Sequence, residues 1–134
     1  MYMNETQIRV RYCETDRMGY LHHGHYIDYF EAGRTELLRS LGLSYREMED
    51  TGIVMPVISL DIRYLAPAYY DELLTIKTIL KEKPLVKLHL EYEIYNDKNK
   101  LLCDGNTTLV FTNSKTRKPC RAPAYFLEKV TDFF

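Results

Sequence analysis

Apolar residues in this chain recur with two different periods, and the point at which the period changes limits the fold more than any other feature. From about residue 24 the spacing is helical. Seven residues at these spacings form one broad stripe: Tyr26, Tyr29, Phe30, Gly33, Leu37, Leu38 and Leu41. Before and after this stripe, apolar residues alternate with polar ones, as is typical of strands. The pattern predicts one long helix over about 24–42 combined with a sheet.

The strand pattern appears once before the helix and four times after it. We expect strands over about 7–12, 58–64, 72–82, 86–94 and 101–112. The segments between the last four are too short for crossover connections, so we expect a mostly antiparallel sheet in which these four strands form a meander. The fold class is therefore α+β.

Two shorter helices are also predicted. Ser44, with Glu47 three residues later, forms a capping box for a helix that ends near Gly52. A terminal helix is expected from Pro123 to Phe134. Because one long helix covers only one face of a sheet, the other face is expected to need a partner, and a second copy of the chain is the simplest one. Gly33 inside the helix indicates close approach to another backbone.

Composition limits the class of protein. The 134 residues fit one domain, 1–134, and the net charge of -1 argues against a polycation built to bind nucleic acid. No apolar run approaches the ~20 residues of a membrane helix, and the N-terminal residues do not resemble a signal peptide. The chain has three cysteines, an odd number that suits a reducing compartment. We expect a cytoplasmic protein without membrane insertion.

The segment from Glu14 to Tyr26 carries most of the chemistry. It contains Asp16 and three histidines, and it leads directly into the predicted helix. A helix N-terminus offers unpaired N–H groups that can stabilise a developing oxyanion, here near His23 and Gly24. A carboxylate facing the same point can attack a carbonyl or deprotonate water.

Other interpretations of these residues remain open at this stage. Asp16 can be a loop-capping residue, and His22, His23 and His25 can form a metal site with it. The metal site is less favoured, because neighbouring histidines do not share the face of a ligand pair. The chain has no G-x-S-x-G elbow and no Gly-rich phosphate loop. Cys13, in the first strand pattern, is expected to be a buried, inert thiol.

The chain resembles a known family over essentially its whole length. The segment Ile8-Arg9-Val10-Arg11-Tyr12-Cys13-Glu14-Thr15-Asp16-Arg17-Met18-Gly19 is followed by His23, Tyr26, Phe30-Glu31 and Gly33-Arg34. This pattern closely resembles the 4-hydroxybenzoyl-CoA thioesterase-like family of hotdog-fold acyl-CoA thioesterases. A second segment, from Asp61 to Leu73, resembles the family less specifically.

The resemblance implies a hotdog fold, in which a curled antiparallel sheet of five to six strands wraps around one long central helix. It also implies a homodimer or homotetramer with its sites at the subunit interface. Asp16 takes the position of the catalytic carboxylate, as nucleophile or as base for water. His23 takes the position whose backbone N–H polarises the thioester carbonyl. Gly24, Tyr26, Arg63 and Tyr64 are expected to contact substrate.

The function implied by the resemblance is hydrolysis of acyl-CoA, without a metal or another cofactor. A carrier-bound acyl chain is an alternative substrate, which would make the chain an acyl-carrier-protein thioesterase. A non-catalytic hotdog module that holds acyl ligands is the alternative from another class. Asp16 argues against that module, because binding alone does not require a carboxylate beside an oxyanion site.

Overall fold

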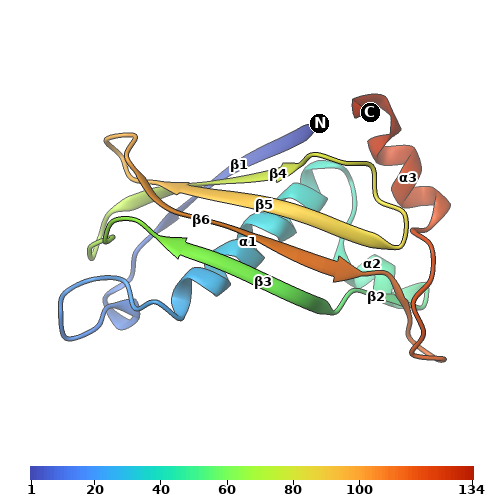
Figure 1. Ribbon diagram of the computed structural model, residues 1–134, viewed down its shortest axis with the longest axis horizontal. Coiled ribbons are helices and arrows are strands. Elements are labelled where there is room, and N and C mark those ends of the chain that lie inside the picture. Colours follow the sequence, from blue (N-terminus) through green and yellow to red (C-terminus); the bar gives the residue numbers. More distant parts are fainter.

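The computed structural model describes residues 1–134 and consists of a five-stranded antiparallel sheet with a helix packed on one face (Figure 1). The main strands are β1 (Tyr2–Arg9), β3 (Val57–Tyr64), β4 (Leu73–Leu80), β5 (Lys87–Tyr95) and β6 (Leu101–Val110). Two short strands, β2 (Ile53–Val54) and β7 (Thr112–Asn113), pair separately. The predicted α+β class and antiparallel sheet are confirmed.

The helices are α1 (His25–Ser40), α2 (Tyr45–Asp50) and α3 (Ala124–Val130), with 3-10 turns η1 (Tyr12–Glu14) and η2 (Thr131–Phe133). The expectation of one long central helix is correct only in part. The longest helix, α1, has 16 residues, and the remaining helical residues lie in short pieces. Gly42, with a φ of 78°, follows α1, and Ser44 caps α2 by accepting a hydrogen bond from the Glu47 N–H. No helix is both long enough and apolar enough to span a membrane.

The strand order differs from the predicted meander. The spatial order is β1-β4-β5-β6-β3, so only β4, β5 and β6 follow one another as neighbours. β3 pairs with β6 at one edge, and β1 occupies the place beside β4 that a meander would give to β3. The segment 65–72 therefore carries the chain from one edge of the sheet to its interior, past the N-terminal end of α1 (Figure 1).

The apolar stripe of α1 packs against the sheet as predicted, and all seven of its residues are buried. Phe30 stacks on Tyr92 of β5, with ring centroids 4.3 Å apart and an interplanar angle of 8°. A Cβ atom at Gly33 would lie 2.5 Å from the Thr78 hydroxyl and 2.8 Å from Ile76. This confirms that Gly33 permits a close approach of the helix to β4.

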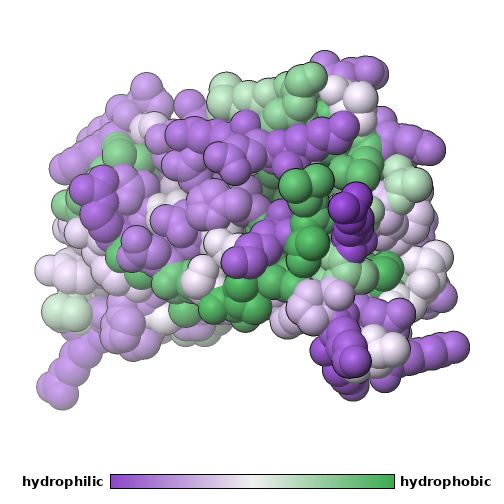
Figure 2. Space-filling model, turned by 45° about the vertical axis from the view of Figure 1, so that its right-hand side comes forward, coloured by the Kyte–Doolittle hydropathy of each residue, from purple (hydrophilic) through white to green (hydrophobic).

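On the face of the sheet that turns away from α1, β5 is polar, and the partner expected for that face stays a prediction. Along β5 the outward positions alternate with buried leucine, tyrosine and isoleucine and carry Lys87, His89, Glu91 and Glu93. Five of the exposed apolar side chains gather on the edge strand β3 and just beyond it: Val57, Ile58, Leu60, Tyr64 and Leu65. Figure 2 shows apolar surface along the lower part of the molecule, the level of β3 in Figure 1.

The first strand begins and ends earlier than predicted. β1 spans Tyr2–Arg9, and the chain then turns into η1, where Cys13 is exposed. The expectation that Cys13 is buried is therefore wrong, because the strand pattern stops before this residue. The turn brings Glu14 into the interior and directs the chain toward the loop that precedes α1.

Candidate active site

Asp16 lies in a tight loop between η1 and α1. Its backbone N–H donates to the Tyr20 carbonyl at 2.8 Å, and Gly19 closes the turn with a φ of 87° that favours glycine. One carboxylate oxygen, Oδ1, accepts the Met18 N–H at 2.9 Å. The loop-capping role considered for Asp16 is thus present, but it uses one oxygen and leaves Oδ2 without a hydrogen-bond partner.

Of the two residues expected to supply backbone donors at the N-terminal end of α1, one has an unpaired N–H. The Gly24 N–H donates to Nδ1 of His22 at 3.1 Å, and the His25 N–H donates to the His22 carbonyl at 3.0 Å. The His23 N–H has no hydrogen-bond partner. Of the two expected donors, the N–H groups of His23 and Gly24, only that of His23 is free. The Gly24 N–H already donates to the His22 imidazole.

A cavity of about 310 Å³ opens where the loop, the start of α1 and the end of β3 meet. Ten residues from these three segments line it: Asp16, Met18, Tyr20, Leu21, His23, Tyr26, Tyr64, Leu65, Ala66 and Pro67. Most of this wall is apolar, and Asp16 provides its one carboxylate. Such a combination suits an apolar ligand that carries one reactive polar group.

Aromatic side chains form one wall of the cavity. The Tyr26 and Tyr64 rings meet edge to face with centroids 5.1 Å apart, and the Tyr64 hydroxyl donates to the His23 carbonyl at 2.9 Å. That bond fixes the peptide unit on the C-terminal side of His23. Burial raises the pKa of Tyr26 to about 12, so its phenol stays protonated near neutral pH.

Four of the six predicted site residues line this one cavity: Asp16, His23, Tyr26 and Tyr64. Gly24 lies beside it as the N-cap of α1. Sequence reasoning missed Met18, Tyr20, Leu21 and the segment from Leu65 to Pro67. The position of this segment directly after the last residue of β3 was the available signal.

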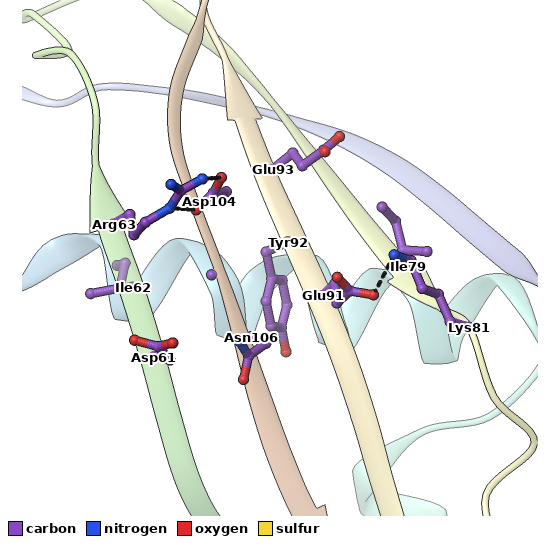
Figure 3. A pocket seen from close by; sticks show the side chains of 11 residues that line it. Asp61, Ile62, Arg63, Ile79, Lys81, Glu91, Tyr92, Glu93, Asp104 and Asn106 are labelled. Carbon is purple, nitrogen blue, oxygen red and sulfur yellow. Dashed lines mark hydrogen bonds and ion pairs between the residues drawn. The ribbon is translucent and has the colours of Figure 1, made fainter.

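Arg63 lies elsewhere. Neighbouring side chains on a strand point to opposite faces, so Arg63 points away from the cavity that Tyr64 lines. Arg63 forms a bidentate pair with Asp104, with Nε at 2.9 Å from Oδ1 and a terminal nitrogen at 2.5 Å from Oδ2. Figure 3 shows this pair in a second hollow of about 250 Å³ on the outer face of the sheet, with the Lys81–Glu91 pair nearby.

The histidines do not form the alternative metal centre. No group of three or more His, Cys, Asp or Glu side chains lies close enough together to hold a metal ion. Nδ1 of His22 accepts from Gly24, and Nδ1 of His25 lies 3.2 Å from Asp28 on the first turn of α1. These contacts assign His22 and His25 to the start of the helix.

Glu14 makes the stability of the protein sensitive to acid. Burial alone would raise the pKa of its carboxyl, but hydrogen bonds from the Arg11 N–H and the Tyr29 hydroxyl, with the Arg11 guanidinium, hold this pKa below its usual range. A folded-state pKa below the unfolded one gives stability that is present above the unfolded pKa. This stability is lost as the pH falls through the folded-state pKa.

We therefore expect the Tm of the wild type to fall more steeply than that of Glu14→Gln between about pH 5 and about pH 3. Calorimetry across this range measures both slopes. Glu128→Gln, which changes an exposed carboxylate on α3 without a hydrogen-bond partner, is the control and should keep the wild-type slope. Parallel slopes for the wild type and Glu14→Gln would contradict this assignment.

Comparison with known proteins identifies relatives across almost the whole chain. The model of the thioesterase-like superfamily matches residues 10–130. The YneP protein of Bacillus subtilis strain 168 is 33% identical over 119 residues, which are 89% of this chain and 86% of the relative. The acyl-CoA thioester hydrolase YbgC of Escherichia coli is 29% identical over 116 residues, 87% of each chain.

A solved structure shares the fold. The crystal structure of the DHNA-CoA thioesterase from Staphylococcus aureus matches 99% of this chain and 91% of its own, with a TM-score of 0.93 and 34% identity. The arrangement of helix and sheet described above is therefore that of a solved thioesterase, in agreement with the expected hotdog fold.

Proposed function

The chain belongs to the thioesterase-like superfamily and is a thioester hydrolase, and from this premise we propose that it hydrolyses acyl-CoA to a free acid and CoA. We treat residues 1–134 as one thioesterase domain. The observation that carries the proposal is the cavity lined by both Asp16 and His23. One has a free carboxylate oxygen and the other an unpaired backbone N–H.

In the proposed reaction, the thioester carbonyl oxygen accepts the His23 N–H at the N-terminal end of α1. This donor and the positive end of the helix dipole stabilise the negative charge that develops on the oxygen. The Asp16 carboxylate either attacks the carbonyl carbon or removes a proton from an attacking water. The carbon–sulfur bond breaks and CoA leaves as the thiolate. Along the first route, water then hydrolyses the acyl-aspartyl anhydride.

The remaining cavity residues are assigned to binding. Tyr26 and Tyr64 form the aromatic wall against which the acyl group or the pantetheine arm packs. Gly24 is assigned to substrate contact through its place directly after His23, as the N-cap of α1. We leave Arg63 out of the site, because its guanidinium pairs with Asp104 in the other hollow.

The three cysteines are free, which supports the proposed cytoplasmic location.

A thiol-release assay over a panel of acyl-CoAs tests the function, with the same acyl groups presented on acyl-carrier protein. Faster release from CoA supports the proposal. Faster release from the carrier protein would favour the acyl-carrier-protein thioesterase. Tight binding of acyl-CoA without turnover on any substrate would favour the non-catalytic module.

We propose that the chain works as a homodimer or homotetramer and that β3 contributes to its interface. An edge strand leaves one row of backbone groups unpaired, and the side chains of Ile58 and Leu60 on β3 are 53% and 39% exposed. Exposed apolar residues on an open sheet edge favour pairing with another chain. The sheet edge would then continue into the second copy.

Lysine on an edge strand opposes such pairing. We expect the double substitution Ile58→Lys with Leu60→Lys to lower the mass in solution from two or four times 15.9 kDa to 15.9 kDa. Size-exclusion chromatography with light scattering measures this mass. Asp97→Lys, in the exposed turn between β5 and β6, is the control and should leave the assembly intact. A wild type that is monomeric at all concentrations would contradict the proposal.

A further inference from the structure

Glu14 is a buried carboxylate for which the proposed reaction has no use. It is 4% exposed, although it lies only two residues before Asp16. A buried charge is costly unless hydrogen bonds satisfy it, so such a residue needs a physical explanation. Its contacts supply that explanation.

Glu14 joins three segments that meet behind the site. Its Oε1 accepts both the Arg11 N–H, at 2.9 Å, and the Tyr29 hydroxyl of α1, at 2.8 Å. Its backbone carbonyl accepts the His22 N–H at 2.8 Å. The residue therefore ties the exit of β1 both to α1 and to the segment directly before His23.

These partners lie next to the groups that the reaction uses. Tyr29 follows Tyr26 by about one helical turn on α1, and Tyr26 lines the cavity. His22 precedes the free N–H of His23, and Asp16 follows Glu14 across a single residue. A shift at Glu14 would move the carboxylate and the oxyanion donor relative to each other.

We propose that Glu14 is a positioning residue, which holds the Asp16 carboxylate and the His23 N–H in register across the cavity by accepting the Tyr29 and Arg11 donors on one oxygen. The inference rests on the proposed function. A displacement of about 1 Å between reacting groups costs up to roughly 10²-fold in rate, so the loss of this contact is expected to lower kcat.

Three variants separate positioning from general stability. Glu14→Leu and Tyr29→Phe remove the contact and should lower kcat for acyl-CoA by about 10-fold or more, with KM changed by less than about 2-fold. Glu14→Gln keeps an oxygen that accepts both donors, so it should keep kcat within about 3-fold of the wild type. Recovery by glutamine would show that the hydrogen bonds, rather than the volume of the side chain, set the rate.

Tyr92→Phe is the matched control. Tyr92 is also a buried tyrosine whose hydroxyl bonds a charged group, accepting from Arg34 at 3.1 Å, with Thr107 at 2.7 Å. It lies on β5 and lines no part of the proposed site. We expect Tyr92→Phe to lower Tm by about as much as Tyr29→Phe while leaving kcat unchanged.

The outcomes distinguish a failure of the positioning role from a failure of the proposed function. If the wild type hydrolyses acyl-CoA and Tyr29→Phe does so as fast as Tyr92→Phe, Glu14 is only a structural residue and the inference fails. If the wild type releases no acyl group from CoA or from acyl-carrier protein, the proposed function itself fails. Should Glu14→Leu not fold, the comparison of Tyr29→Phe with Tyr92→Phe decides the question.

Discussion

We expect Asp16→Asn to lower kcat for acyl-CoA hydrolysis by about 10²–10⁴-fold, the range that a positioned acid–base group contributes. The amide has almost the same shape as the carboxylate, and its oxygen can still accept the Met18 N–H. The loop should therefore keep its conformation. What the variant lacks is the anionic oxygen that attacks the thioester or activates water, so the loss should appear in kcat rather than in folding.

Thiol release measures turnover, and circular dichroism measures folding. Asp104→Asn is the matched control, since it makes the same chemical change in the other hollow, where the carboxylate pairs with Arg63. It should keep turnover close to that of the wild type. A folded Asp16→Asn protein with wild-type turnover would rule out the role given to Asp16.

We expect Gly105→Ala to destabilise the fold by about 3 kcal/mol, near the upper end of the usual cost of overpacking a core. Gly105 lies on β6, and a Cβ atom there would collide with the backbone carbonyl of Asp61 on β3 and lie 2.7 Å from the Phe30 ring of α1. The strand backbone cannot yield as a flexible side chain can. The substitution therefore has to push β3 or α1 away from β6.

Urea unfolding of the wild type and of Gly105→Ala measures the loss of free energy of unfolding. In thermal unfolding, the Tm of Gly105→Ala should fall by an amount on the order of 10 °C for a domain of this size. Asn106→Ala is the control on the same strand, because Asn106 lines the outer hollow and is only half-buried. Equal urea midpoints for Gly105→Ala and Asn106→Ala would contradict the close packing of Gly105 against Asp61 and Phe30.

Most of the helices and strands could be predicted from the sequence, but the order of the strands could not. The helical stripe around Phe30 and the alternation along β5 are local patterns, so each predicts its own element. Strand order depends on which edges pair across the sheet. Nothing in the spacing of β3 shows that it lies beside β6, with β1 beside β4.

The site shows the same division. Asp16 and His23 were predicted because one short segment carries a carboxylate and leads into a helix, and Tyr26 was predicted through the family resemblance. Tyr64 was found through its resemblance to a family segment, and Arg63 was assigned with it, although the alternation of a strand already places the two on opposite faces. The contribution of the segment from Leu65 to Pro67 to the cavity was missed, because it depends on how the chain passes the start of α1.

The sequence by itself determined most of the secondary structure, the α+β class and the family, because periodicity, capping residues and motifs are properties of neighbouring residues. Only the tertiary structure decided which backbone N–H stays unpaired, which oxygen of Asp16 is free, and where the buried Glu14 carboxylate finds its donors. Hydrogen bonds are directional and short. Their partners therefore depend on how distant segments pack, which local sequence patterns do not encode.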